Sequence, residues 1–235
     1  MIRTMNAALL TINEMIGGIR DGSAGNHSDG WQPDVAVESD QQRRTQEIIM
    51  YAPRETAGWR LLVGPYAPMV AEYLPYNPES PKVAAWIIEG IASVDTRLKI
   101  EHIGSSAVAG CWGKGIIDLL VLYRSGGFES ARDLLDRLGF QHQYGAERFP
   151  ESRPMRVGSF EYFGRLYRIH AHVIEAGSCE ARDLLLFRDL LRSDNTVRQA
   201  YEREKRAILS RGIIKSTDYS KAKGDFIRRV LSAKQ

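Results

Sequence analysis

The sequence predicts an α/β (α+β) fold, in which helices flank a mixed β-sheet and the C-terminal part of the chain is helical. Three observations lead to this prediction. Short β-like and helical segments alternate through the middle of the chain, residues 116–123 form a nearly continuous apolar run typical of a central buried strand, and apolar residues recur at helical spacing from residue 181 onward. With 43% hydrophobic and 26% charged residues, a wholly disordered chain and a disulfide scaffold are excluded.

The first 59 of the 235 residues are predicted to form an N-terminal extension, flexible or partly docked, ahead of a folded domain at residues 60–235. Residues 17–40 are rich in Gly, Ser, Asn and Asp, a composition that buries too little surface to stay ordered alone. A short helix is expected at residues 5–16. No apolar run approaches the ~18 residues of a membrane span, and residues 1–20 lack the basic start of a cleaved signal peptide, so neither is expected.

The folded domain is predicted from local signals taken in chain order. Ser80 is expected to cap the first helix with Pro81 in its first turn, and Gly139 is expected to end the second helix. The expected elements begin with β-like runs at 61–63 and 69–74, a helix from residue 80, strands at 98–103 and 116–123, and a helix after 125–127. Short strands follow near 140–144 and 158–163, and a strand at 166–174 forms a hairpin with the strand before it. Helices are expected at 181–192, 196–210 and 217–232, and the helix at 196–210 carries Val197, Tyr201, Glu204 and Ile208 on its inner side.

The net charge of +3 is too small to imply a nucleic-acid partner, but the charge is unevenly distributed. Residues 168–235 hold fifteen Lys and Arg against nine Asp and Glu, whereas residues 1–60 hold six against eight. The basic C-terminal third would favour a phosphate-bearing ligand, and the alternative is a set of solvated helix faces. Cys111 and Cys179 have no paired-ligand spacing and are expected to be free thiols in a reducing, cytoplasmic compartment.

A Gly-Ser pair at the end of a predicted strand marks a candidate phosphate site. Gly104 lets the backbone approach a ligand closely, and Ser105 adds a hydroxyl donor at a helix start, where free N–H groups attract an anion. Thirteen residues later, Asp118 lies in the middle of an apolar strand. A buried carboxylate needs a partner such as a metal, a base or a backbone donor, so Asp118 is either functional or bonded to neighbouring N–H groups.

Three histidines accompany these residues on predicted strands. His170 and His172 are two apart, which places both imidazoles, and Arg168 with them, on one face of the sheet. His102 comes just before Gly104 on another strand. Imidazole and carboxylate groups are what a transition metal or a proton-transfer site needs, provided that the strands bring them together.

The residues named above resemble the sequence signature of a known family. The stretch from Ile100 to Val108, IEHIGSSAV, followed by Lys114 and Ile116-Ile117-Asp118, resembles the signature of the GrpB family. Further segments are similar to the family in the same order: the turn at 75–78, the His-x-His strand at 170–172, the FRDLLR helix at 187–192, and the closing helices with Tyr201, Lys205, Tyr219 and Lys223. The resemblance covers residues 74–231.

The resemblance implies a nucleotidyltransferase-like fold. In such folds a Gly-Ser pair holds nucleotide phosphates, and an acidic pair on the next strand holds a divalent metal. Here Leu120 stands where the second acid is expected. Mg²⁺ prefers an array of hard oxygen ligands, so the expected divalent metal is either Mg²⁺ or a transition metal held by Asp118, His170 and His172.

A group-transfer enzyme acting on a phosphate-bearing donor is the expected function. The resemblance implies a nucleotide, a coenzyme A-like compound (some members are fused to dephospho-coenzyme A kinase) or an aminoacyl-tRNA (some GrpB-like fungal proteins make arginine-containing cyclodipeptides from it). The expected catalytic residues are Asp118, His170, His172 and His102, with Glu101 in support. The expected substrate-binding residues are Gly104, Ser105, Ser106, Lys114, Arg168, Arg188, Tyr219 and Lys223.

Three alternatives stay open at this point. Because Leu120 replaces the second acid, the protein could be a non-catalytic nucleotide- or phosphate-binding module. It could also be a tRNA-dependent cyclodipeptide-forming enzyme, since spread positive charge suits a phosphate backbone. A third possibility is an interaction protein whose acidic N-terminal extension makes the contact.

Overall fold

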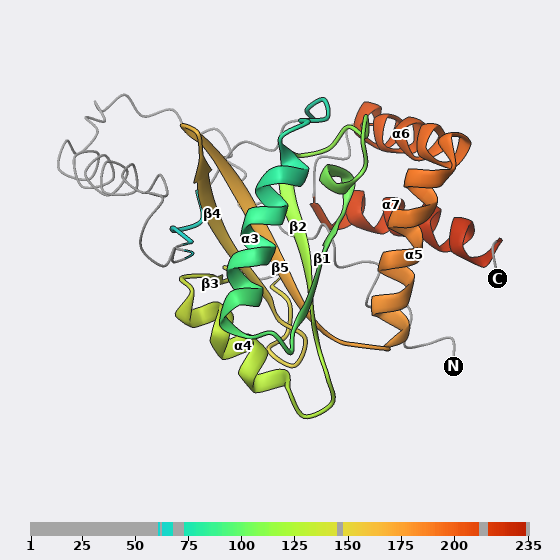
Figure 1. Cartoon of the computed structure of the whole chain (residues 1–235). Helices are drawn as coiled ribbons and strands as arrows, with labels where there is room; N and C mark the ends of the chain where they lie inside the picture. The colour runs from blue at the N-terminus through green and yellow to red at the C-terminus, as the bar shows by residue number, and fades with distance from the viewer. Residues whose placement is uncertain (1–60, 62, 68–72, 145–147, 212–215, 234–235) are drawn as a thin grey trace, which may run out of the picture.

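The computed structural model describes residues 61–233 except 62, 68–72, 145–147 and 212–215, and it describes the backbone alone at 216–220 (Figure 1). The predicted extension, its helix at 5–16 and most of the β-like run at 69–74 therefore lie outside the described residues. On either side of residues 68–72, Gly64 and Leu74 form isolated β-bridges with Ser159 and Gly113 rather than regular strands.

In the part of the chain that the structure describes, five strands form one sheet, which is mixed as predicted. They are β1 (Lys99–Ile103), β2 (Ile116–Tyr123), β3 (Gln141–His142), β4 (Met155–Tyr162) and β5 (Arg165–Glu175), in the spatial order β1-β2-β5-β4-β3. β2 and β5 are parallel, and every other neighbouring pair is antiparallel. The nearly continuous apolar run of β2 follows from its interior place, because both of its faces are covered by helices.

The turn between β4 and β5 confirms the predicted hairpin. Phe163 and Gly164 both have positive φ, 47° and 74°, which gives the tight turn the twist that an antiparallel pair requires.

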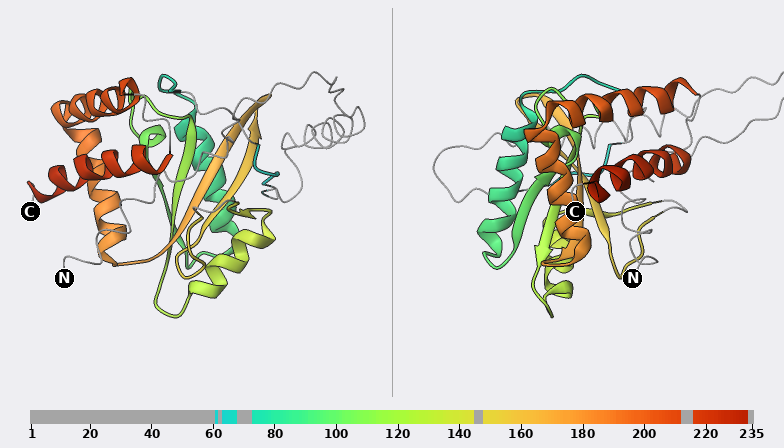
Figure 2. Two further views of the ribbon diagram at one scale, coloured as in Figure 1. Left: turned by 180° about the vertical axis from the view of Figure 1, so that it is seen from behind. Right: turned by 90° about the vertical axis from the view of Figure 1, so that its right-hand side faces the viewer.

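Helices cover both faces of the sheet (Figures 1 and 2). The helices α3 (Ser80–Val94) and α4 (Phe128–Arg137) pack on one face, against a core that includes Ile117, Leu119 and Val121 of β2. The helix α5 (Cys179–Ser193) packs on the other face, against Leu120 and Leu122. The last helices, α6 (Asn195–Ser210) and α7 (Ser216–Ser232), pack on α5 through a separate apolar cluster. The predicted α/β fold with a helical C-terminal part is confirmed.

Two local predictions were wrong. Glu79, not Ser80, is the N-cap residue of α3, because the side chain of Asn77 already accepts the Glu79 N–H and Ser80 becomes the first helical residue. On α6 the buried positions include Glu202 and Lys205, whereas Glu204 is partly exposed. The charged residues on the inner side of α6 are therefore the ion pair of Glu202 and Lys205, not Glu204.

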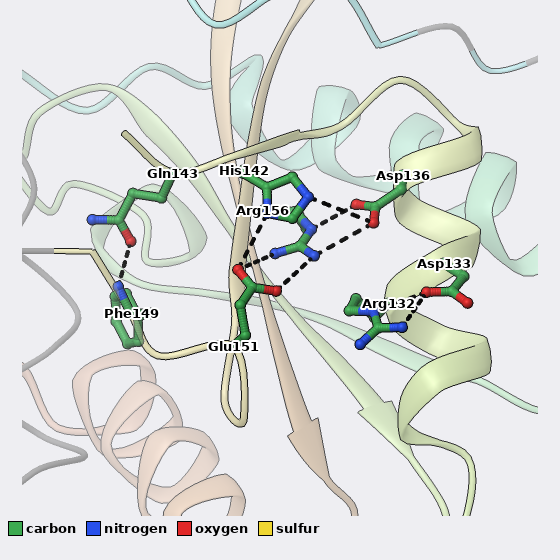
Figure 3. Close-up of polar contacts among 8 residues, drawn as sticks. All are labelled: Arg132, Asp133, Asp136, His142, Gln143, Phe149, Glu151 and Arg156. Carbon is green, nitrogen blue, oxygen red and sulfur yellow. Dashed lines mark hydrogen bonds and ion pairs between the residues drawn. The ribbon is translucent and has the colours of Figure 1, made fainter. Parts of the chain in front are cut away.

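A buried arginine fixes α4 to the sheet (Figure 3). Arg156 on β4 is 1% exposed, and its guanidinium donates to Asp136 Oδ1 on α4 at 2.6 Å and to Glu151 Oε2 at 3.1 Å. His142 on β3 lies 3.2 Å from Glu151 Oε1. Because two carboxylates satisfy the buried charge, this cluster is a structural link between α4, β4 and the segment before β4.

The described helices include none that is both long and apolar enough to cross a bilayer.

Candidate functional site

A small cavity lies where β2 and β5 meet the three C-terminal helices. Its volume is about 60 Å³. One wall comes from the sheet and the loop after β1, and the other from α5, α6 and α7. The described residues that line it are Ile103, Gly104, Ser105, Gly113, Lys114, Ile116, Asp118, His170, Leu184, Phe187, Arg188, Leu191, Tyr201, Lys205, Lys223 and Ile227.

Asp118 and His170 form the acid–base pair of this cavity. They are directly opposite each other in the parallel β2–β5 pair, and His170 Nδ1 lies 3.5 Å from Asp118 Oδ1. On its other side, His170 Nε2 lies 3.1 Å from the hydroxyl of Tyr66, and the two rings stack. Burial raises the pKa of Tyr66, so its hydroxyl stays protonated. His170 is thus held between a carboxylate and a phenol, with the carboxylate toward the cavity.

The Gly-Ser pair packs directly against this carboxylate. Gly104 has φ 74°, and a Cβ atom at this position would lie 2.3 Å from Asp118 Oδ2. Ser105 begins a short 3₁₀ turn, Ser105–Ala107, and its hydroxyl lies where a Cβ atom on Gly113 would be. Only glycine at 104 and 113 leaves room for this arrangement.

Three lysines reach the cavity from three parts of the chain. Burial lowers the pKa of Lys114 to about 8 and that of Lys223 to about 7, an effect that Asp118 opposes in both cases. Lys205 on α6 is 2% exposed and lies 3.1 Å from Glu202 Oε1. A phosphate group placed among these side chains would meet several donors of the right charge.

Side chains from α6 and β5 hold the loop that carries Lys114 through hydrogen bonds to its main-chain groups. Glu202 accepts the Trp112 N–H at 2.8 Å, and Lys205 Nζ donates to the Trp112 carbonyl. Arg168 Nη2 donates to the Lys114 carbonyl at 3.0 Å. The predicted binding residue Arg168 is 3% exposed and is absent from the cavity wall, so it positions Lys114 rather than touching a ligand in the cavity.

Register separates His102 and Ser106 from the acid–base pair. Ile103, not His102, is opposite Asp118 in the β1–β2 pair, so His102 faces the other side of the sheet. Its Nε2 lies 3.0 Å from the hydroxyl of Ser106. Burial lowers the pKa of His102 to about 4. His102 and Ser106 thus bond to each other, away from the cavity.

His172 shares a face with His170 but lies farther along the strand. It is fully buried, with Nδ1 3.3 Å from Arg153 Nη1 and the ring of Phe149 packed edge-on. Burial, with Arg153, holds the pKa of His172 well below its usual range. The predicted grouping of His172 with Asp118 is therefore not formed at the cavity.

Arg188 and Tyr219 complete the set of predicted residues. Arg188 lines the cavity, but its guanidinium already pairs with Glu101 at 2.8 Å and with Asp189 at 2.8 Å. The predicted support by Glu101 thus acts through Arg188. Tyr219 lies on α7, and its side chain lies outside the described residues.

The residues present do not fit a resident divalent metal. Among the described residues, no group of three His, Cys, Asp or Glu side chains could hold an ion. Leu120 has no exposed surface and packs under α5, so no second carboxylate can approach from that position. Asp118 and His170 supply two donors of different type with lysines beside them, which is a poor match to Mg²⁺. The divalent metal stays a prediction.

The sequence prediction did not assign Tyr66, Glu202 or Lys205 to the site, although Lys205 is part of the family resemblance. A signal existed for Lys205, because it lies one turn after Tyr201 and three residues before Ile208 on the buried stripe of α6. No comparable pattern marks Tyr66, which reaches His170 across 104 positions of sequence.

Comparison with known proteins places the chain in a family. The GrpB protein family matches residues 71–233, more than half of the chain. The UPF0157 protein SCO7215 of Streptomyces coelicolor is 35% identical over 136 residues, which is 57% of this chain and 67% of the relative.

Two solved structures are similar in outline. GrpB from Enterococcus faecalis aligns over 68% of this chain and 99% of its own, at 19% identity and a TM-score of 0.49. The RNA terminal uridylyl transferase Cid1 aligns over 57% of this chain and 42% of its own, at 12% identity and a TM-score of 0.42. Identities this low say nothing about activity. By the match of its sequence, the chain belongs to the GrpB family.

Proposed function

We propose that the protein is a group-transfer enzyme that holds the phosphate of a donor molecule in this cavity. One observation supports it above all: Lys114, Lys205 and Lys223 line the same cavity as Gly104 and Asp118, although they come from separate parts of the chain. Cationic donors, a glycine turn and an acid–base pair are the parts that phosphate-assisted transfer needs.

The size of the cavity limits what enters it. A volume of about 60 Å³ suits a phosphate-sized group with water, whereas whole-ligand pockets measure roughly 300 Å³ or more. The rest of the donor would therefore lie outside the cavity. Nucleotides, coenzyme A-like compounds and aminoacyl-tRNA all meet this condition.

Each residue has a separate role in the proposed transfer. Lys114 and Lys223 bind the phosphate oxygens, while Ser105 donates its hydroxyl. Asp118 accepts the proton of the attacking hydroxyl or amine as that atom bonds to the transferred group, and the bond from this group to the rest of the donor breaks, its electron pair leaving with the donor fragment. His170 holds the carboxylate in position through the 3.5 Å contact. No step uses a metal ion, and a chelator is expected to leave ligand binding unchanged.

A ligand panel followed by product analysis tests this function. The full chain is titrated with nucleotides, coenzyme A species and aminoacyl-tRNA in a thermal-shift assay, and mixtures with amine or hydroxyl acceptors are analysed by mass spectrometry. Asp118→Asn is expected to keep binding and lose transfer by at least about a hundredfold. Lys114→Met is expected to weaken binding, while Lys82→Met, on the surface of α3, is not.

A non-catalytic phosphate-binding module is the second candidate, favoured by the burial of Leu120 where a second acid would stand. Under it, a ligand binds and no product forms with any acceptor. If no phosphate compound of the panel binds, both candidates are wrong. If aminoacyl-tRNA is the ligand, its binding should weaken steeply as the salt concentration rises, because contacts to its phosphates release counterions.

A further inference from the structure

Lys223 is the cavity lysine that α7 contributes. Its side chain projects from α7 into the cavity wall and is 6% exposed. Phe187, Tyr201 and Ile227, from the three C-terminal helices, line the same wall. An ammonium group in such apolar surroundings loses most of its hydration.

Titratable groups on several neighbouring elements interact with Lys223. The nearest cationic groups are Lys114 on the loop before β2 and Lys205 on α6, and the charge of Lys205 is shared with Glu202. Arg188 on α5 is paired with Glu101 and Asp189. Among the described residues, the other titratable groups near Lys223 include Asp118 on β2, His170 and His172 on β5, the hydroxyl of Tyr201 on α6 and the thiol of Cys111.

This arrangement has more positive than negative charge. Among the described residues that line the cavity, Asp118 is the only acidic one. Burial, with Lys114 adding to it, lowers the pKa of Lys223 to about 7, against the attraction of Asp118. Releasing one proton is the way in which a ligand-free cavity relieves the repulsion among its lysines.

We propose that the cavity binds a dianionic phosphate group together with one proton, which Lys223 takes up as the ligand enters. This rests on the proposed function and names the charge state of its ligand. The proton comes from solvent and converts the neutral amine of Lys223 to an ammonium, which donates to a ligand oxygen. No covalent bond to the ligand forms or breaks in this step.

The sign of the pH dependence follows. Bound phosphate stabilises the charged form, so the pKa of Lys223 is higher in the complex than in the free protein. Binding takes up a proton between those two values and is strongest below pH 7. Affinity is expected to fall by up to about tenfold for each pH unit above pH 7, the slope of a one-proton linkage, and more steeply above pH 8, where Lys114 also titrates.

Calorimetry with sulfate measures the proton directly. Sulfate is a dianion of phosphate-like shape that does not itself titrate near neutral pH. The full chain is titrated with sulfate at pH 7.5 in buffers of different ionisation enthalpy, which gives the number of protons taken up per ion bound. We expect about one proton per sulfate, most of it at Lys223.

Three variants test whether Lys223 is the residue that takes up the proton. Lys223→Met should lose most of the uptake and flatten the pH dependence, because methionine matches the size of the lysine stem and cannot titrate. Lys114→Met should bind more weakly but keep most of the uptake. Lys221→Met, exposed on the same helix, should match the wild type.

The outcomes separate this inference from the proposed function. Sulfate binding with no proton uptake overturns the inference and leaves the proposed function standing. Unchanged uptake in Lys223→Met overturns the assignment to Lys223. If neither sulfate nor any phosphate compound binds, both fail. If Lys223→Met does not fold, the wild-type proton count and the pH slope decide.

Discussion

At the scale of single residues, the contact between Gly104 and Asp118 sets the shape of the site. The glycine has a positive φ and lies so close to the carboxylate that a Cβ atom would be 2.3 Å from Asp118 Oδ2. Gly110, with φ 75°, has no atom within 4 Å of the same position. Substitutions at the two glycines therefore distinguish the cost of a positive φ from a steric clash with Asp118.

Gly104→Ala is expected to weaken sulfate or phosphate binding at least tenfold, since the new methyl group displaces the Asp118 carboxylate. Gly110→Ala carries the strain of positive φ alone, about 1 kcal/mol, and should bind as the wild type does. Calorimetric titration and urea unfolding of both variants measure the two effects. Equal binding in the two variants would contradict the proposed importance of the contact.

Residue-level prediction from sequence succeeded where a residue's neighbours in sequence decide its place. Gly104, Ser105 and Asp118 lie at one cavity because a strand, a turn and the next strand are consecutive. His102 was misplaced because its face depends on the β1–β2 register, and Ile103 is the residue opposite Asp118. A shift of one residue reverses the face, and no pattern within β1 fixes it.

At the scale of elements, α6 holds the loop of Lys114 through one ion pair. Glu202 accepts the N–H of Trp112, and Lys205 donates to the carbonyl of the same residue. Glu202 also accepts from the hydroxyl of Tyr73 at 3.0 Å. A side-chain pair thus satisfies the main chain where no strand is available. Lys114 follows two residues later, so its position depends on this pair.

Lys205→Met is expected to lower the free energy of unfolding by about 3 kcal/mol, because it leaves the buried Glu202 with only the exposed Arg206, at 3.7 Å, as a cation. Glu204→Gln, on the partly exposed side of α6, should change it by less than about 0.5 kcal/mol. Urea unfolding of both variants is the measurement. A stable Lys205→Met protein would show that the pair is dispensable.

The packing of α5 on β2 depends on Leu120. It is fully buried in a cluster with Leu184 and Ala181 of α5. Leu120→Asp is therefore expected to destabilise the fold by several kcal/mol, since an unpaired carboxylate would be buried there, whereas Leu120→Met should cost less than about 1.5 kcal/mol. If Leu120→Asp were stable and bound Mg²⁺ by calorimetry, position 120 would be a site for a metal-binding acid after all.

At the scale of the whole molecule, buried histidines couple stability to pH. Burial lowers the pKa of His102 from 6.5 to about 4 and that of His172 well below 6.5. The unfolded chain therefore binds protons more readily between pH 6.5 and 4, and folding stability must fall as the pH is lowered through this range. His102 alone contributes a loss of up to about 3 kcal/mol by pH 4.

Urea unfolding at pH 7, 5.5 and 4 measures this loss. In His102→Gln the loss should be smaller, because glutamine keeps a hydrogen bond toward Ser106 and cannot take up a proton. A stability that stays constant from pH 7 to pH 4 would contradict the burial of both imidazoles.

The fold as a whole was more predictable than the site. Strand β2 and helices α4 to α7 follow from apolar periodicity and from glycines such as Gly139, which are local signals. The wall formed by Lys205, Lys223 and Phe187 depends on how three helices pack on one another. That packing is set by contacts between distant residues, which one sequence read alone does not reveal.

The cavity lies between the sheet and the C-terminal helices, and this placement affects how the molecule moves. An anion held by Lys114 and Lys223 would link the loop before β2 to α7, two segments that are far apart along the chain. Local opening of α7 would then require release of the ion. Amide hydrogen exchange along α7 should accordingly slow when sulfate is added, while exchange in α4, on the opposite face of the sheet, stays the same.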